Sequence, residues 1–256
     1  MAAKKIRLDR LLVDRGDVPT LEKARALIMA RAVKVNEAYP DKAGTTVPLD
    51  AAIQIKSDSN PYVSRGGLKL AGAIQKFNLN VEGLAAFDVG ASTGGFTDCL
   101  LQKGARKVYA LDVAYGQLAW KLREDKRVVV IERTNCRYYD GADLDEKIDL
   151  AVIDVSFISL KIVIPAILKF LEKGARILAL IKPQFEAAQK EVGEGGVVRD
   201  VSVQERVVAE IRCFCESLEM EVEGTCDSPI LGPSGNKEFF ILARKMHGTV
   251  LFRQSR

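Results

Sequence analysis

Apolar runs of strand length alternate with amphipathic stretches over most of the chain after residue 61. The runs are the segment that ends at Asp88 and residues 107–111, 128–131, 150–153, 177–181 and 239–242. Apolar residues at helical spacing lead up to Phe77, follow Gly95, and recur over residues 117–123, 160–171 and 204–218. Strands and helices that alternate at these lengths predict an α/β fold with a doubly wound, mostly parallel sheet.

Residues 1–60 have a different pattern. Leu8, Leu11 and Leu12 share one helical face that ends before Gly16, and Thr20 is placed to cap a second helix. Short alternating segments at residues 33–35 and 53–55 predict strands. The domain organisation that follows is a compact α+β module over residues 1–60, a linker over 61–66, a larger domain over 67–245 and a basic tail over 246–256.

A glycine-rich turn joins the strand that ends at Asp88 to the helix that follows. The turn contains Gly90, Ser92, Thr93, Gly94 and Gly95. Glycines allow positive φ and a close approach of the backbone to a ligand, and amides at a helix N-terminus face that ligand. The next strand leads to Asp112, about 20 residues past the glycines, where a carboxylate can bind the two hydroxyls of a ribose. Together these features predict a nucleoside site.

The spacing of the glycines distinguishes between nucleosides. Dinucleotide folds carry G-x-G-x-x-G, but the sequence here is G-A-S-T-G-G, so Ser92 stands where a second glycine would admit a pyrophosphate. This departure favours a nucleoside without phosphates, and S-adenosylmethionine fits that description. Asn135, just past the third strand, is a further candidate, for a residue that flanks the adenine. A tight turn that binds no ligand is the alternative interpretation of the glycines alone.

Charged residues stand at the carboxyl ends of three predicted parallel strands. Asp112, Asp154 and Lys182 each follow an apolar run. In open α/β sheets a ligand binds outside these ends, so we expect the three side chains at one site. A charged residue there can also simply mark the return of the chain to solvent. Residues 187–200, which contain three glycines, are predicted to form a flexible loop above this edge and are a candidate lid.

Composition excludes several classes of chemistry. The chain has 256 residues, 48% hydrophobic and 28% charged, and lacks the roughly 18 consecutive apolar residues of a membrane span. Its five cysteines show no C-x-x-C spacing, and its single histidine, His247, lies near the C-terminus. We therefore expect no metal site and no Ser-His-Asp triad. The expected protein is soluble and cytoplasmic, and Lys, Asp, Glu or Tyr must carry out any proton transfer.

Positive charge is concentrated near the N-terminus. Residues 1–35 contain nine basic and four acidic residues, whereas the whole chain has a net charge of +4. Such an excess on a small module is typical of a phosphate-binding surface. The candidates for RNA contact are Arg7, Arg10, Lys23, Arg25, Arg31 and Lys34. A solvated charged surface that binds nothing is the alternative.

Two groups of motifs resemble known families. The segments RLDRLLVDRG and TLEKARALIMARAVKVN resemble the S4-like RNA-binding domain first recognised in ribosomal proteins. Behind them, SRGGLKL, DVGASTGGF, DVSFISL, IKPQFE and GPSGNKEFF follow the order of the TlyA (hemolysin A) family, whose catalytic domain is similar to FtsJ-type ribose methyltransferases. The resemblance, over residues 5–244, implies a Rossmann-like S-adenosylmethionine-dependent methyltransferase domain behind a small S4-like domain. It also implies methyl transfer to cytidine 2′-hydroxyls of ribosomal RNA, free or in ribosomal subunits.

The same resemblance implies a catalytic tetrad of Lys69, Asp154, Lys182 and Glu238. A ribose hydroxyl is a poor nucleophile until its proton leaves, and an ordinary lysine, with a pKa of about 10.4, keeps its own proton at neutral pH. Burial and a second ammonium lower the pKa of a lysine, and carboxylates orient it. We assign Lys182 to the hydroxyl, Asp154 and Glu238 to its orientation, and Lys69 to support or RNA anchoring. A Lys182 that stays protonated and only positions the oxygen is the alternative.

Functions of other classes compete with this interpretation. A non-catalytic RNA-binding or ribosome assembly factor would use the same basic module, but it would not need the tetrad residues in their motifs. A base methyltransferase more often carries an N-P-P-Y-like loop or a catalytic cysteine after the fourth strand, where this chain has DVSF at residues 154–157. The name hemolysin suggests pore formation, but the sequence has no long apolar or strongly amphipathic segment. Any hemolytic activity is therefore expected to be indirect.

Overall fold

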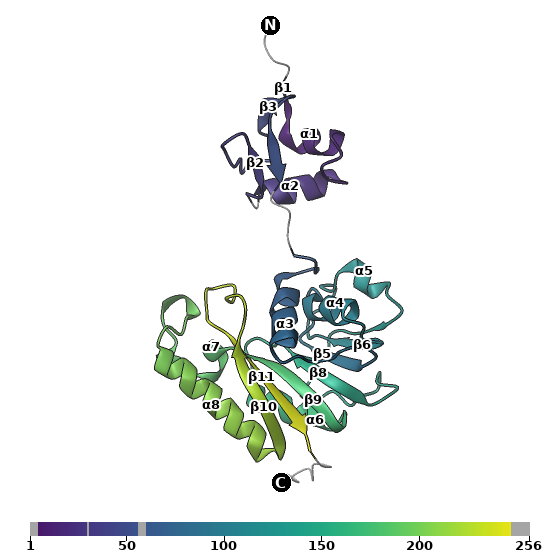
Figure 1. Cartoon of the computed structure of the whole chain (residues 1–256), viewed down its shortest axis with the longest axis vertical. Helices are drawn as coiled ribbons and strands as arrows, with labels where there is room; N and C mark the ends of the chain where they lie inside the picture. Colours follow the sequence, from purple (N-terminus) through teal and green to yellow (C-terminus); the bar gives the residue numbers. More distant parts are fainter. Residues whose placement is uncertain (1–4, 30, 56–59, 247–256) are drawn as a thin grey trace. The chain divides into compact units, whose positions relative to one another are not determined.

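The chain divides into two compact units, Met1–Pro61 and Tyr62–Arg256. The computed structural model describes residues 5–29, 31–55 and 60–246 (Figure 1). The sequence placed a linker at residues 61–66, but helix α3 of the second unit begins at Arg65. His247 and nearly all of the predicted basic tail lie outside the described residues.

The first unit is a small α+β fold. Its elements are β1 (Lys5–Arg7), α1 (Leu8–Asp14), α2 (Leu21–Met29), β2 (Val33–Val35), β3 (Thr46–Pro48) and β4 (Ile53–Ile55). The strands form two antiparallel pairs, β1 with β3 and β2 with β4. As predicted, Leu8, Leu11 and Leu12 are buried in the core of this unit. Thr20 accepts a hydrogen bond from the backbone N–H of Lys23 at 3.2 Å, as expected of a cap.

The second unit is built on a seven-stranded sheet with the order β10-β11-β9-β8-β5-β6-β7. Its strands are β5 (Ala85–Val89), β6 (Lys107–Leu111), β7 (Val128–Ile131), β8 (Ile148–Ile153), β9 (Leu171–Ile181), β10 (Met220–Asp227) and β11 (Phe239–Lys245). Strands β5 to β9 are parallel, and β11 runs antiparallel to both of its neighbours. The α/β fold class and the mostly parallel sheet are confirmed.

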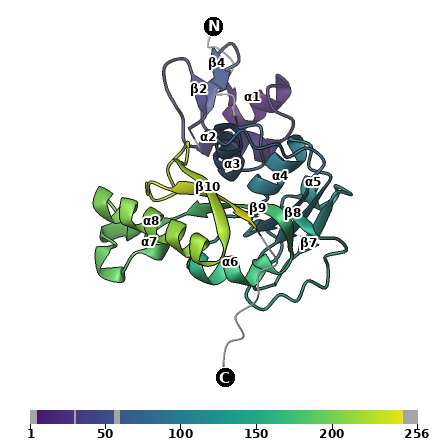
Figure 2. The same ribbon diagram turned by 60° about the horizontal axis from the view of Figure 1, so that its bottom comes forward.

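Helices cover both faces of this sheet, as Figure 2 shows for α3 and α4 on one side and α6 on the other. The helices are α3 (Arg65–Lys76), α4 (Gly95–Gln102), α5 (Trp120–Arg123), α6 (Leu160–Leu168), α7 (Pro183–Glu186) and α8 (Val201–Ser217). One apolar cluster joins α6 and α8 to the sheet, and a second joins α3 and α4 to the opposite face. Because both faces are buried, the central strands are almost wholly apolar.

Three predicted helix boundaries were wrong, each because of a specific contact. The helix expected from residue 117 begins at Trp120, because the backbone N–H of Ala119 is bound to the carbonyl of Thr93. The helix expected over 160–171 stops at Leu168, and Leu171 already pairs with β8. Helix α8 begins at Val201 rather than at residue 204, because Asp200 caps it through the N–H of Ser202.

The segment 187–200, expected to be a flexible loop, has local structure. It contains two 3₁₀ turns, η1 (Gln189–Glu191) and η2 (Glu194–Gly196). The buried side chain of Asn236 holds it at two points, accepting from the N–H of Val198 at 3.0 Å and donating to the carbonyl of Gly196 at 2.9 Å. The segment is therefore tied to the residues just before β11, and its role as a lid stays a prediction.

Candidate active site

The register of the sheet brings three of the four tetrad residues to one edge. Parallel pairing joins β5 to β8 and β8 to β9 up to their carboxyl ends, so Asp154 and Lys182 emerge at the same edge as Gly90. Phe239 pairs antiparallel with Ile181, so Glu238 occupies the position opposite Lys182, one step beyond the ladder. The fold itself therefore places these side chains where ligands bind in open α/β sheets.

Lys182 and Asp154 form a largely buried ion pair. The ammonium lies 2.6 Å from Oδ1 of Asp154, with side-chain exposures of 10% and 19%. This oxygen is buried and has no aligned hydrogen bond among the described residues, whereas Nζ of Lys182 donates to Oγ of Ser156 at 3.1 Å. Pro183 occupies the first turn of α7, which keeps Lys182 extended at the end of β9. The pair therefore places a lysine and a carboxylate in contact at the carboxyl edge of the sheet, with Oδ1 of Asp154 closed off from solvent.

Lys69 and Glu238 form a second ion pair, more deeply buried than the first. Nζ of Lys69, on α3, donates to Oε2 of Glu238 at 2.6 Å, and the side chains are 7% and 1% exposed. Gly232 is needed beside them, because a Cβ at this position would lie 2.4 Å from Oε1 of Glu238. The predicted tetrad is therefore present as two lysine–carboxylate pairs, and the sequence did not indicate which lysine meets which carboxylate.

The glycine-rich turn crosses directly in front of Asp154. Gly90 has φ +91°, and a Cβ there would lie 2.6 Å from the carbonyl oxygen of Asp154. A Cβ on Gly95 would lie 2.2 Å from Oγ of Ser64. Both positions therefore require glycine, the first for conformation and close approach, the second for close approach alone.

Asp112 organises the other predicted donor-site residues. Its Oδ2 accepts from the N–H of Ser92 at 2.7 Å and its Oδ1 from the N–H of Ala114 at 2.8 Å. The carbonyl of Asp112 accepts from the N–H of Thr134, which brings the exposed Asn135 to the same edge. Thr93 is also exposed. Each carboxylate oxygen keeps a second lone pair, so Asp112 can still bind ribose hydroxyls.

Asp88 is a buried acid that sequence reasoning did not assign to the site. Its Oδ2 accepts from the hydroxyl of Thr97 at 2.6 Å, whereas its buried Oδ1 has no partner among the described residues. Burial, helped by the nearby carboxylates of Asp154 and Asp112 and opposed by the hydrogen bonds from Thr97, raises the pKa of Asp88 to about 7. The sequence could have indicated Asp88, because it is the first residue of the motif DVGASTGGF.

Two loops meet beside the Lys182–Asp154 pair, and their aromatic residues were also missed. Phe157, 90% exposed and at φ +62°, lies against Phe185 with ring centroids 4.9 Å apart. Glu186 accepts from the hydroxyl of Ser159 at 2.5 Å and from the N–H of Leu160 at 2.7 Å, at the start of α6. Burial raises the pKa of Glu186. These contacts fasten the loop after β8 to the loop after β9.

The predicted RNA-contact residues all lie in the first unit, and several are already paired. Arg7 and Arg25 both bind the fully buried Asp9, at 2.8 and 3.2 Å. Hydrogen bonding to Arg7 is the main reason that the pKa of Asp9 falls to about 2, and burial opposes it. Both arginines remain about half exposed, with 51% and 52% of their side chains accessible. Asp9 therefore fixes these guanidinium groups at the surface of this unit.

The remaining members of this set are at the surface. Arg31 pairs with Asp41 at 3.2 Å and Lys34 with Glu37 at 2.9 Å, whereas Arg10 and Lys23 are exposed without an ion pair among the described residues. Surface pairs of this kind are weak and can exchange one anion for another.

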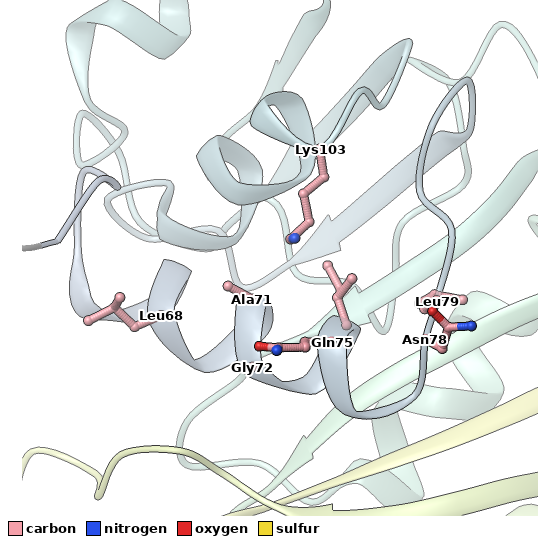
Figure 3. A pocket seen from close by; sticks show the side chains of 8 residues that line it. Leu68, Ala71, Gly72, Gln75, Asn78, Leu79 and Lys103 are labelled. Atoms are coloured by element: carbon pink, nitrogen blue, oxygen red, sulfur yellow. The ribbon is translucent and has the colours of Figure 1, made fainter.

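A cavity of about 520 Å³ lies apart from the predicted site. It is lined by Leu68, Ala71, Gly72, Ile74, Gln75, Asn78, Leu79 and Lys103, most of which are shown in Figure 3. None of these is a predicted site residue. Within residues 5–29, 31–55 and 60–246, no cluster of His, Cys, Asp and Glu could hold a metal ion, and no helix is long and apolar enough to cross a membrane.

Comparison with known proteins identifies the fold. A family model described as FtsJ-like methyltransferase matches residues 62–245, which is nearly the whole second unit. The chain belongs to the FtsJ-like methyltransferase family. The site at the edge of β5, β8 and β9 is therefore the candidate active site of this FtsJ-like domain.

Relatives are similar to the chain over both units. The protein named 16S/23S rRNA (cytidine-2′-O)-methyltransferase TlyA from Mycobacterium tuberculosis is 43% identical over 243 residues, which cover 94% of this chain and 91% of the relative. YqxC of Bacillus subtilis, named as a candidate rRNA methyltransferase, is 48% identical over 242 residues, 94% of this chain and 86% of the relative. A solved structure of a candidate hemolysin from Streptococcus thermophilus is 42% identical, with a TM-score of 0.75 and coverage of 96% and 90%. The resemblance to the TlyA family is confirmed, whereas the S4-like assignment stays a prediction.

Proposed function

We propose that this FtsJ-like methyltransferase transfers the methyl group of S-adenosylmethionine to cytidine 2′-hydroxyls of ribosomal RNA. The observation that carries the proposal is the buried Lys182–Asp154 pair beside the glycine-rich turn. Lysine and carboxylate side chains are suited to a hydroxyl substrate, because they can hold and accept its proton. The ribosomal and cytidine specificity is taken from the name of the M. tuberculosis relative. A ribosomal substrate makes the cytoplasm the proposed place of action.

The residues of the turn fit S-adenosylmethionine. The absent Cβ of Gly90 leaves the backbone open in front of Asp154, and Asp112 retains acceptor capacity for two ribose hydroxyls. When bound, the sulfonium of S-adenosylmethionine supplies an electrophilic methyl group. Gly90, Gly94, Gly95, Ser92, Thr93, Asp112 and Asn135 are the residues that we propose for this pocket.

The tetrad acts on the ribose hydroxyl. Lys182 contacts the 2′-oxygen and, after losing its own proton to solvent, accepts the hydroxyl proton at Nζ as a neutral amine, while Asp154 holds the lysine in place from 2.6 Å. Glu238 binds Lys69, so Lys69 has a supporting role. The exposed ring of Phe157, beside this pair, offers a flat surface for an RNA base. Proton acceptance and base contact thus come from adjacent loops.

The first unit is proposed to supply RNA affinity. Arg7 and Arg25, fixed by Asp9, present planar groups that suit phosphate oxygens. Arg10, Lys23, Arg31 and Lys34 are the other proposed contacts. Affinity that depends on such contacts should fall steeply as salt concentration rises.

Methyl transfer by Lys182→Ala tests the proposal. The variant should lose about 10²–10⁴-fold in rate while it keeps donor and RNA affinity, because a proton acceptor contributes mainly to the transition state. Alkaline cleavage of RNA requires a free 2′-hydroxyl. The assay therefore maps the methylated positions in ribosomal RNA as those that resist alkaline cleavage. Lys173→Ala is the matched control, because Lys173 is exposed at the opposite end of the same strand.

The outcomes separate the rival functions. Methyl groups found only on bases would show a base methyltransferase, and a wild-type protein that binds RNA but transfers no methyl group would show a non-catalytic factor. Full activity of Lys182→Ala would remove Lys182 from the mechanism. Replacement by a cation that cannot act as a base, Lys182→Arg, should also be inactive, whereas a purely positioning lysine would tolerate it in part.

A further inference from the structure

We propose that Ser156 is a positioning residue that aims Lys182 at the ribose hydroxyl. The inference rests on the proposed function. Oγ of Ser156 accepts a hydrogen bond from Nζ of Lys182 at 3.1 Å. The closer contact of Nζ with Asp154, at 2.6 Å, is an ion pair without hydrogen-bond alignment. The serine therefore fixes the orientation of the ammonium group, and the aspartate compensates its charge.

The geometry of an ammonium explains why a second partner matters. Nζ has three directions besides its bond to Cε. In Lys182 one direction is held by Ser156, with Asp154 alongside at 2.6 Å, so rotation about the Cε–Nζ bond is fixed and the lone pair of the neutral amine can face the 2′-oxygen. Ser156 is exposed, whereas the side chain of Lys182 is only 10% exposed, so the serine meets the lysine from its solvent side. Without this hydroxyl the ammonium can rotate about the Cε–Nζ bond, and the side chain can change rotamer.

The loop that carries Ser156 is held firmly enough for this role. On one side of Ser156, the N–H of Asp154 donates to the carbonyl of Val89 at 3.0 Å. On the other side, Phe157 packs on Phe185, and Glu186 binds the start of α6. Phe157 takes φ +62°, a conformation that is costly for a bulky residue and is often found at functional sites. The hydroxyl of Ser156 is thus presented by a loop constrained at both ends.

Single-turnover methyl transfer to ribosomal RNA tests this role. Ser156→Ala should slow the step by about 10- to 100-fold, the effect expected when a hydrogen bond to a charged group is lost from the transition state. Calorimetric affinity for S-adenosylhomocysteine and RNA affinity should stay unchanged. Ser156→Thr keeps the hydroxyl and should restore most of the rate. Ser217→Ala, an exposed serine at the end of α8 whose hydroxyl binds a backbone carbonyl, is the matched control.

A double-mutant cycle distinguishes positioning from general support of the loop. If Ser156 acts through Lys182, Ser156→Ala should have no further effect in a Lys182→Ala background. The proposal would be overturned if the rate losses of the two single substitutions multiplied in the double variant. A wild-type rate for Ser156→Ala would also overturn it.

A second readout needs no enzymatic activity. Reductive methylation followed by mass spectrometry should label Lys182 faster in Ser156→Ala than in the wild type, with Lys173 as the internal reference. Unchanged labelling of Lys182 would contradict the role of Ser156. A wild-type protein that transfers no methyl group to RNA would instead contradict the proposed function, so the two failures are distinguishable.

Discussion

The buried Lys69–Glu238 pair allows stability and catalysis to be separated by experiment. Glu238→Ala would leave the ammonium of Lys69 without its partner in a place where that side chain is 7% exposed. Breaking a buried pair in this way costs about 3–5 kcal/mol, because the remaining charge is not compensated. In a domain of this size each kcal/mol shifts the melting temperature by about 2–4 °C. The expected loss is therefore about 6–20 °C.

Removal of both charges should have a different result. The double variant Lys69→Met/Glu238→Leu fills the same space with apolar side chains, and such replacements are often neutral or stabilising. We expect the free energy of unfolding of this double variant to lie within about 2 kcal/mol of the wild-type value. Methyl transfer should nevertheless stay low in both variants, because Glu238 is a member of the proposed tetrad, directly before β11 at the active edge.

The assay combines thermal unfolding, followed by circular dichroism, with methyl incorporation into ribosomal RNA. Asp227→Ala is the control, because Asp227 pairs with Lys237 at the surface, where a pair contributes at most about 1 kcal/mol. A Glu238→Ala variant as stable as this control would show that Lys69 escapes to solvent and would refute the argument from burial. An active double variant would remove both residues from the chemistry.

Two further predictions concern the end of β5. Gly90→Ala would place Cβ 2.6 Å from the carbonyl oxygen of Asp154 at φ +91°, so affinity for S-adenosylhomocysteine should fall at least about tenfold by calorimetry, and wild-type affinity would refute the pocket. Burial raises the pKa of Asp88 from 3.8 to about 7, so the folded state retains a proton that the unfolded chain loses. The contribution of protonated Asp88 to the free energy of unfolding is complete below about pH 4 and is lost as the pH rises through about 7. In urea unfolding, Asp88→Asn should therefore gain stability relative to the wild type between pH 5 and pH 8, and parallel profiles would refute this.

Much of the sheet could be predicted because its central strands are buried on both faces. The apolar runs that precede Asp154 and Lys182 end in the structure where the sequence indicated. Their starts were missed, because β8 begins at Ile148 and β9 at Leu171, where polar residues interrupt the apolar run. β10 (Met220–Asp227) was missed for the opposite reason. It lies at the edge of the sheet and alternates polar with apolar residues, so it has no apolar run to detect. Edge strands of this kind carry a weak signal in a single sequence.

The site could be predicted as a set of residues but not as a set of contacts. The motifs indicated the four tetrad members, yet the pairing of Lys69 with Glu238 joins positions 169 residues apart and depends on where α3 packs. Ser156 lay within a recognised motif, but its bond to Lys182 follows from the path of a loop that includes a residue at positive φ. In the first unit, Arg7 and Arg25 were expected at the surface, and the buried Asp9 between them was not recognised as their partner.

The charge balance of the active edge has a consequence for RNA binding. Each tetrad lysine is matched by a carboxylate, and Asp112 adds a further negative charge beside them. Such a site cannot attract a polyanion by net charge, however well it suits one hydroxyl. Under the proposed function, affinity for RNA comes from cations outside this edge, and the half-exposed arginines of the first unit are the proposed candidates. A catalytic edge without net positive charge is thus consistent with the proposed division of labour, in which the first unit supplies the RNA affinity.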